Sequence, residues 1–157
     1  MFHKASFLYI FYVILKRFSF LLDILTFVKE AKVEKNPSKI FIQVGTNDLT
    51  VHKDVTKLHD DLMNAINQLA AKFPGARTYV STLLPRKDDL NAATVEFNKL
   101  LDNTCDTTPG IRLVTHVDIT RQDLYDNLHL HNYGFFKFVC NINRIVFGIP
   151  PPKKKHR

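Results

Sequence analysis

The chain has 157 residues, 45% hydrophobic and 24% charged, a composition typical of one globular domain and not of a disordered or collagen-like chain. Its formal net charge is +7, but four positive charges lie in residues 153–157, so the remainder gives no strong signal for nucleic-acid binding. The five glycines are at least 14 positions apart, which excludes a Rossmann fingerprint and a P-loop. The two cysteines are 35 positions apart, which excludes a CxxC site, and nothing around them argues for a disulfide.

The first 20 residues form an atypical apolar segment. Residues 7–15 (FLYIFYVIL) are continuously apolar or aromatic, and after Lys16 and Arg17 a second apolar stretch continues to residue 28. A membrane span needs about 20 apolar residues, and the charges divide this segment into halves that are each too short. A secretory signal would need a small-residue cleavage site, which the sequence does not offer. We take a buried strand or helix of an intracellular protein as the first interpretation; a signal, or membrane association through residues 7–28, stays open.

From residue 18 onward, hydrophobic periodicity predicts helices and strands in alternation. The expected helices cover residues 18–28, 55–73, 91–101 and 134–147, and the expected strands cover residues 40–44, 77–84 and 111–117. The stripe of the first helix contains Leu21, Leu22 and Val28, and Asn91 is expected to cap the third helix. The alternation predicts an α/β fold, a three-layer α/β/α (flavodoxin-like) arrangement around a short parallel sheet.

We divide the chain into three parts. The apolar segment covers residues 1–20, one α/β domain covers residues 21–149, and a basic, proline-rich tail covers residues 150–157. The tail is interpreted first as a solvated terminus and second as a localisation or anion-binding patch.

Polar residues follow the strands at the end where ligands bind in parallel α/β sheets. The tetrapeptide GTND follows the first strand, and DNLHLHN comes after the last. Asp126, three residues before His129, can orient the imidazole and stabilise it when charged, as a serine-activating base requires. The side-chain amide of Asn47 can donate to a developing oxyanion, and Gly45 lets the backbone pass close to the site. The residues therefore indicate acyl-transfer chemistry.

Other polar residues near the strand ends have simpler interpretations. Asp48 is expected to hold the Asn47 loop, and His116 is expected to be a satisfied core histidine. Arg86 either contacts substrate or solvates its loop. A zinc site of His129, His131 and Asp126 is the weaker alternative, because the His-x-His pair lacks a further ligand at suitable spacing.

Residues 40–49 (IFIQVGTNDL) and 126–134 (DNLHLHNYG) resemble two blocks of the SGNH, or GDSL-like, hydrolase superfamily, GxND and DxxH. The resemblance covers about residues 22–148. It implies an esterase-type domain acting on a small ester or acyl substrate, with no metal and no cofactor. It further implies that Asn47 is an oxyanion-hole donor, His129 the general base and Asp126 its orienting partner, with Gly45 shaping the loop that bears Asn47.

The sequence departs from that family before residue 45. The family places its nucleophilic serine in a GDS motif after the first strand, upstream of GxND, whereas this chain has no glycine before Gly45 and no Asp-Ser pair. Ser6, Ser19 and Ser38 are not convincing substitutes, so no nucleophile is assigned. The first strand and the nucleophile block are expected to be missing or replaced, with the apolar segment covering the open edge of strand 40–44.

The resemblance then implies a domain that is weakly active or inactive as written. It would be a truncated product, a product of a mispredicted start, or a degenerate relative (a pseudoenzyme) kept for binding. One alternative is an active serine esterase in which Ser6, Ser19 or a second chain supplies the hydroxyl. The other is a non-enzymatic interaction module associated with membrane or nucleic acid through its ends. The oligomeric state stays open.

Overall fold

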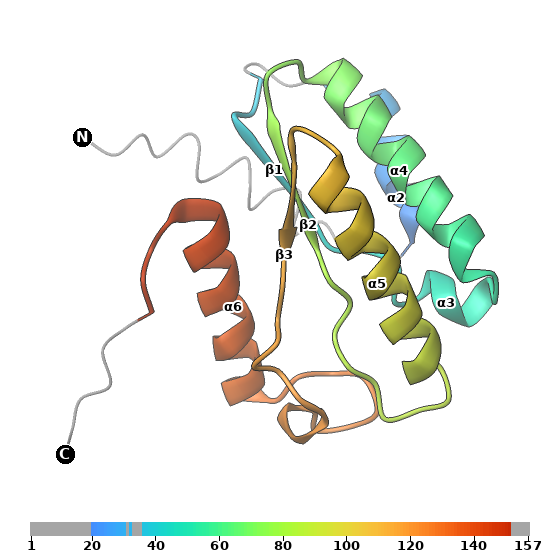
Figure 1. Ribbon diagram of the computed structural model, residues 1–157, viewed down its shortest axis with the longest axis vertical. Helices are drawn as coiled ribbons and strands as arrows, with labels where there is room; N and C mark the ends of the chain where they lie inside the picture. Colours follow the sequence, from blue (N-terminus) through green and yellow to red (C-terminus); the bar gives the residue numbers. More distant parts are fainter. Residues whose placement is uncertain (1–19, 31, 33–35, 152–157) are drawn as a thin grey trace.

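The computed structural model describes residues 20–30, 32 and 36–151 of the chain. Three parallel strands form its sheet in the order β1 (Lys39–Ile42), β2 (Arg77–Ser81) and β3 (Ile111–Val114) (Figure 1). The predicted strands and their parallel arrangement are confirmed.

All three strands end earlier than expected, β1 at Ile42, β2 at Ser81 and β3 at Val114. A side chain supplies the reason beyond β2. The Leu83 N–H donates to Oδ1 of Asn98 at 2.8 Å, and Nδ2 of Asn98 donates to the Leu83 carbonyl at 2.9 Å. The amide of Asn98 thus takes the backbone groups that a longer strand would have paired with a neighbour.

Helices cover both faces of the sheet, which gives three layers (Figure 1). One face carries α2, α4 and α5, and the other carries α6. The helices are α2 (Leu21–Glu30), α3 (Asp48–Val51), α4 (Val55–Lys72), α5 (Asn91–Thr107) and α6 (Asn132–Phe147), with a 3-10 turn, η1 (Arg121–Asp123).

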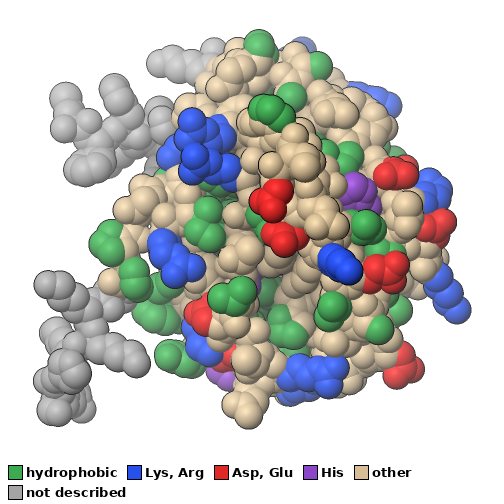
Figure 2. Space-filling view, in the orientation of Figure 1, with side chains coloured by type: hydrophobic (Ala, Val, Ile, Leu, Met, Phe, Trp, Pro, Cys, Tyr) green, Lys and Arg blue, Asp and Glu red, His purple; other side chains and the backbone are tan. Residues whose placement is uncertain are grey.

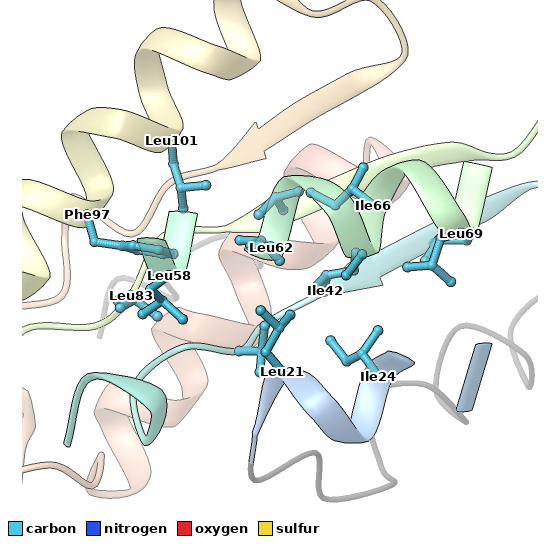
Figure 3. Close-up of a cluster of buried hydrophobic side chains, with 14 of the residues drawn as sticks. Leu21, Ile24, Ile42, Leu58, Leu62, Ile66, Leu69, Leu83, Phe97 and Leu101 are labelled. Atoms are coloured by element: carbon cyan, nitrogen blue, oxygen red, sulfur yellow. The ribbon is translucent and has the colours of Figure 1, made fainter. Parts of the chain in front are cut away.

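Each face of the sheet has its own hydrophobic core, because successive side chains of a strand point to opposite faces. Ile40 and Ile42 belong to the larger cluster, with residues of α2 and α4, and Figure 3 shows Ile42 there. Phe41, between them in sequence, belongs to the second cluster, with residues of α6. Both faces of β1 are therefore buried from Ile40 to Ile42, which explains why these three residues are all apolar.

Two details of the helices differ from the prediction. The buried stripe of α2 is Leu21, Ile24 and Val28, whereas Leu22 is 70% exposed, because α2 presents a narrow i, i+3, i+7 face to α4. Asn91 is the first residue of α5 and not its cap; its Oδ1 instead accepts the Arg86 N–H at 2.9 Å. The cap position belongs to Leu90, whose side chain makes no capping hydrogen bond.

The apolar segment lies outside the described residues apart from Phe20, and the tail lies outside them apart from Pro150 and Pro151. The predicted covering of the β1 edge therefore falls outside them too; within them, β1 pairs with β2 alone. No helix in the described part combines the length and apolar character needed to cross a bilayer. Acidic and basic side chains are interspersed over the face shown in Figure 2, without a stripe of one sign.

Candidate active site

A cavity of about 260 Å³ lies at the carboxyl ends of β1 and β2. The loop after β1, the loop after β2 and the segment before α6 each contribute to its wall. Asn47 and His129, which are 82 positions apart in sequence, both line it, together with Gly45. The structure thus brings the two predicted strand-end motifs to one place, as the parallel topology requires.

The loop that carries Asn47 turns sharply at Gly45, whose φ is +114°. This backbone conformation favours glycine, and a Cβ at that position would meet only ordinary contacts, so conformation and not space explains the residue. The half-buried Asn47 side chain makes no hydrogen bond with any described residue, although it precedes α3. Its amide is therefore available to donate into the cavity.

Asp48 anchors this loop to α2, as the sequence predicted in part. Its carboxylate is 5% exposed and accepts the Leu21 N–H at the start of α2, at 3.1 Å to Oδ1. Burial raises the pKa of the Asp48 carboxyl, against the lowering effect of that hydrogen bond. Asp48 thus holds the Asn47 loop through a buried contact with α2, and it does not line the cavity.

Arg86 also holds this loop, which neither sequence interpretation anticipated. The side chain is 3% exposed, so it is not solvated, and it does not line the cavity. It donates to the Thr46 carbonyl at 2.9 Å and with two nitrogens to the carboxylate of Asp88, at 2.8 and 2.6 Å. The side-chain hydrogen bond from Arg86 is the main reason that the pKa of Asp88 lies below its usual range.

His129 and Asp126 form a closely coupled pair in the loop before α6. One oxygen of Asp126 accepts the N–H groups of Leu128 and His129 at 2.7 and 2.6 Å, and the other lies 2.7 Å from Nδ1 of His129. These contacts, the backbone N–H of His129 first, lower the pKa of Asp126 to about 2. Because an ionised carboxylate only accepts hydrogen bonds, Nδ1 carries the proton and Nε2 of the neutral ring keeps its lone pair.

Tyr125 is a neighbour of His129 that the sequence analysis missed, although it does not line the cavity. Its ring stacks on the His129 imidazole with centroids 5.8 Å apart and an angle of 17° between the planes. The pairing follows from a local turn in which the Tyr125 N–H donates to the His129 carbonyl at 3.0 Å. The sequence did offer a signal for this contact, because Tyr125 directly precedes Asp126 of the DxxH motif.

His131 closes the start of α6. Its Nδ1 accepts the Gly134 N–H at 3.1 Å, so the proton is on Nε2, which lies 3.1 Å from the Gln122 carbonyl. Both ring nitrogens are therefore engaged, which argues against the zinc alternative. Among the described residues, no group of three His, Cys, Asp or Glu side chains could hold a metal ion.

A serine–histidine pair lies in the interior, away from the cavity, where Oγ of Ser81 and Nε2 of His116 are 2.9 Å apart. Nδ1 of His116 faces Nδ2 of Asn141, a donor, so the histidine proton is on Nε2 and points at Ser81. The Ser81 hydroxyl in turn donates to the Thr82 carbonyl at 2.9 Å. His116 is thus a satisfied core histidine, as predicted, and it does not withdraw a proton from Ser81.

No serine of the described part lines the cavity; its one hydroxyl side chain is that of Thr46. Ser38 precedes β1, and Ser6 and Ser19 lie outside the described residues. Within the described residues, the structure therefore places the Asn47 amide and the His129 imidazole at the cavity and no serine beside them.

Comparisons with solved structures show the fold. A carbohydrate esterase family 3 protein from Talaromyces cellulolyticus matches with a TM-score of 0.62 and 18% identity, over 71% of this chain and 58% of that one. A mutant acetyl esterase with acetate ion matches with a TM-score of 0.68 and 17% identity, over 80% and 63%. A lipolytic protein of the G-D-S-L family from Veillonella parvula DSM 2008 matches with a TM-score of 0.67 and 17% identity, over 82% and 73%. The chain thus spans less than two thirds of the length of the first two.

No curated protein matches the sequence significantly. A family profile does match, across residues 16–138, which include both strand-end motifs and the whole sheet. The chain therefore belongs to the GDSL-like lipase/acylhydrolase family.

Proposed function

We propose that this domain carries the base and the oxyanion donor of an ester hydrolase. His129 is the general base, Asp126 its orienting partner, Asn47 the donor, and Gly45 the residue that shapes the Asn47 loop. The observation that supports the proposal is the shared cavity: His129 and Asn47 line it from distant parts of the chain, and Asp126 holds Nδ1 of His129 at 2.7 Å.

The chemistry follows from those positions. Nε2 of His129 removes the proton of a hydroxyl as its oxygen bonds to the ester carbonyl carbon, and the carbonyl oxygen becomes an oxyanion that accepts a hydrogen bond from Asn47. The Asp126 carboxylate stabilises the imidazolium formed in this step. When the carbon–oxygen bond to the leaving alcohol breaks, the imidazolium returns the proton to that alcohol.

The proposed substrate is an ester with a small acyl group, such as an acetyl ester. The cavity of about 260 Å³ is below the usual range of small-molecule sites, roughly 300–1,000 Å³, which favours a short acyl chain. The acetyl esterase and the carbohydrate esterase of similar fold support the same class.

We further propose that the sequence, as it stands, lacks the serine nucleophile and hydrolyses esters weakly or not at all. A triad enzyme that loses a member keeps roughly 10³–10⁴ of acceleration over water from its other groups. We therefore expect the wild-type protein to hydrolyse p-nitrophenyl acetate slowly, and we expect the rate to fall further in His129→Ala and Asn47→Ala. His52→Ala is the matched control, because His52 is exposed and does not line the cavity. Equal rates in all four proteins would contradict the assigned roles of His129 and Asn47.

A fluorophosphonate probe tests the nucleophile separately, because it labels activated serines. We expect no labelled serine after peptide mapping. Labelling of Ser6 or Ser19 that disappears in His129→Ala would contradict the missing nucleophile and support an active serine esterase. The roles of His129 and Asn47 would survive that result.

The missing first strand is a related proposal. Alternating hydrogen bonds direct the backbone groups of Ile40 and Ile42 to β2, so those of Lys39, Phe41 and Gln43 face the open edge. We propose that residues 1–20 cover this edge in place of the family's first strand. Deleting residues 1–17 should then lower solubility and the thermal midpoint, and unchanged values would contradict the covering role.

A further inference from the structure

A second and larger cavity, of about 520 Å³, lies between α5 and the segment that follows β3. One wall is formed by α5 residues from Asn91 to Asp102, and the other runs from Leu113 at the end of β3 to Arg121 at η1. Among the described residues, Leu83 is the one residue that lines both cavities. The volume of the larger cavity is within the range of small-molecule sites, roughly 300–1,000 Å³.

Thr94 gives the first indication of a ligand. The residue is 1% exposed and lines this cavity from α5, yet its hydroxyl oxygen has no hydrogen-bond partner among the described residues. It is the one buried side-chain polar atom of the described part in that condition. Buried hydroxyls are normally satisfied, so a group that enters the cavity would supply the missing partner.

The uncommitted polar groups of the cavity are mostly donors. Lys99 and Arg121 are exposed, line the cavity and form no ion pair or side-chain hydrogen bond with any described residue. Asn91 uses only its oxygen, toward the Arg86 N–H, so its amide nitrogen is uncommitted. Among the described residues of the lining, Asp102 is the one acidic side chain, so the two cations Lys99 and Arg121 outnumber it.

The remaining polar side chains of the lining are largely committed within the protein. Asn98 is bound to the backbone of Leu83 through both its amide atoms, and His116 is engaged through both ring nitrogens. The lining also contains apolar side chains, among them Val95 from α5 and Leu113 from β3. A ligand that fits therefore has an anionic head and a short apolar body.

We propose that this cavity binds a small organic anion, a carboxylate or a phosphate monoester. Lys99, Arg121 and the Thr94 hydroxyl hold the anionic head, and Val95 and Leu113 contact the apolar part. The inference does not rest on the proposed esterase function, because none of His129, Asp126 and Asn47 lines this cavity.

Amide chemical-shift titrations with hexanoate, hexyl phosphate and hexan-1-ol test the proposal and distinguish the two kinds of anion. We expect saturable shifts for Thr94, Val95 and Lys99 with at least one of the anions, and binding at least tenfold weaker with the alcohol. Equal shifts with hexan-1-ol, or no saturable shift with either anion, would overturn the proposal.

Two variants sharpen the test. Thr94→Val removes the hydroxyl at nearly constant shape, so the anion should bind severalfold more weakly while the thermal midpoint of the free protein does not fall. Lys99→Met should weaken binding of the anion and not of hexan-1-ol. Lys53→Met, which removes a cation outside the cavity, is the control and should bind as the wild type does. Unchanged anion binding in both Thr94→Val and Lys99→Met would contradict the site.

Discussion

At the scale of single residues, the charged side chains around the proposed active site mainly fix backbone. Asp126 binds the N–H groups of its own turn, Asp48 binds the first N–H of α2, and Arg86 binds the Thr46 carbonyl. Hydrogen bonds from charged groups to backbone are stronger than neutral ones and hold loops in one conformation. The position of Asn47 thus depends on residues that do not reach the cavity themselves.

Replacing Arg86 should loosen the Asn47 loop. Arg86→Ala leaves the Thr46 carbonyl and the Asp88 carboxylate without their partner, and we expect the free energy of unfolding to fall by about 1–3 kcal/mol. This loss of stability is smaller than that for breaking a fully buried ion pair, because the Asp88 side chain is 32% exposed. Urea unfolding measures this loss, and faster amide hydrogen exchange at residues 46–49 would show where the structure opens.

Arg86→Lys is the informative companion variant. Lysine keeps the charge but cannot present two nitrogens to Asp88 while reaching Thr46, so it should recover only part of the stability. Lys87→Ala, at the next position, serves as a surface control, because the Lys87 side chain is exposed and donates a hydrogen bond to the Leu124 carbonyl and not to the Asn47 loop. Protection of residues 46–49 as complete in Arg86→Ala as in the wild type would contradict the positioning role.

At the scale of elements, the start of α6 is the most tightly constrained junction near the site. His131 caps the helix, the Leu124–Leu130 bridge closes the turn that carries His129, and Gly134 lies against the backbone of Asp123. A Cβ at residue 134 would approach the Asp123 carbonyl oxygen to 2.6 Å, which is closer than real Cβ atoms come to such an atom. The glycine is required here by close approach and not by a positive φ.

Gly134→Ala should therefore destabilise the protein although alanine is the better helix former. A gain of up to about 1 kcal/mol from helix propensity opposes an overpacking penalty of about 1–3 kcal/mol, and the backbone contact cannot be relieved by a side-chain rotation. Thermal unfolding followed by circular dichroism measures the net loss. Asn132→Ala, an exposed position in the same turn of α6, is the control and should change the midpoint little. A higher midpoint for Gly134→Ala would show that η1 moves away from α6 without penalty.

The elements also show how far the sequence predicted the fold. The helices α4 and α6 and the three strands followed from periodicity, because each buries a face whose pattern is local. The end of β2 did not follow, since Asn98 on α5 decides it from 15 positions away. The same reason hid the role of Arg86, whose partner Thr46 lies 40 positions away, and the partner of Asp48, which is Leu21, 27 positions away. The two motifs of the site were visible because the family keeps them at strand ends.

At the scale of the whole molecule, one buried polar network joins the sheet to the helix on its second face. It runs from Ser81 at the end of β2 through His116 beyond β3 to Asn141 on α6, and Nδ2 of Asn141 also donates to Asp118 at 2.6 Å. The contact between His116 and Asn141 requires the His116 ring to be neutral, because a proton on Nδ1 would face the Nδ2 donor of Asn141. Burial lowers the pKa of His116 to about 4, against a smaller opposing effect of Asp118.

This network predicts how the stability of the protein depends on pH. In the unfolded chain His116 takes up a proton near pH 6.5, whereas in the folded protein it stays neutral down to about pH 4. Between these values the unfolded state binds more protons, so the free energy of unfolding falls as the pH is lowered, by about 2–3 kcal/mol from pH 6.5 to 4.5. The carboxyl of Asp126, with a pKa lowered to about 2, loses its stabilising effect only below this window. Urea unfolding at pH 7, 5.5 and 4.5 should show the decline in the wild type and a flatter dependence in His116→Gln, because glutamine at position 116 has no titratable group. Parallel curves for the two proteins would mean that the neutral His116 ring does not link β2, β3 and α6 in the way that the hydrogen bonds indicate.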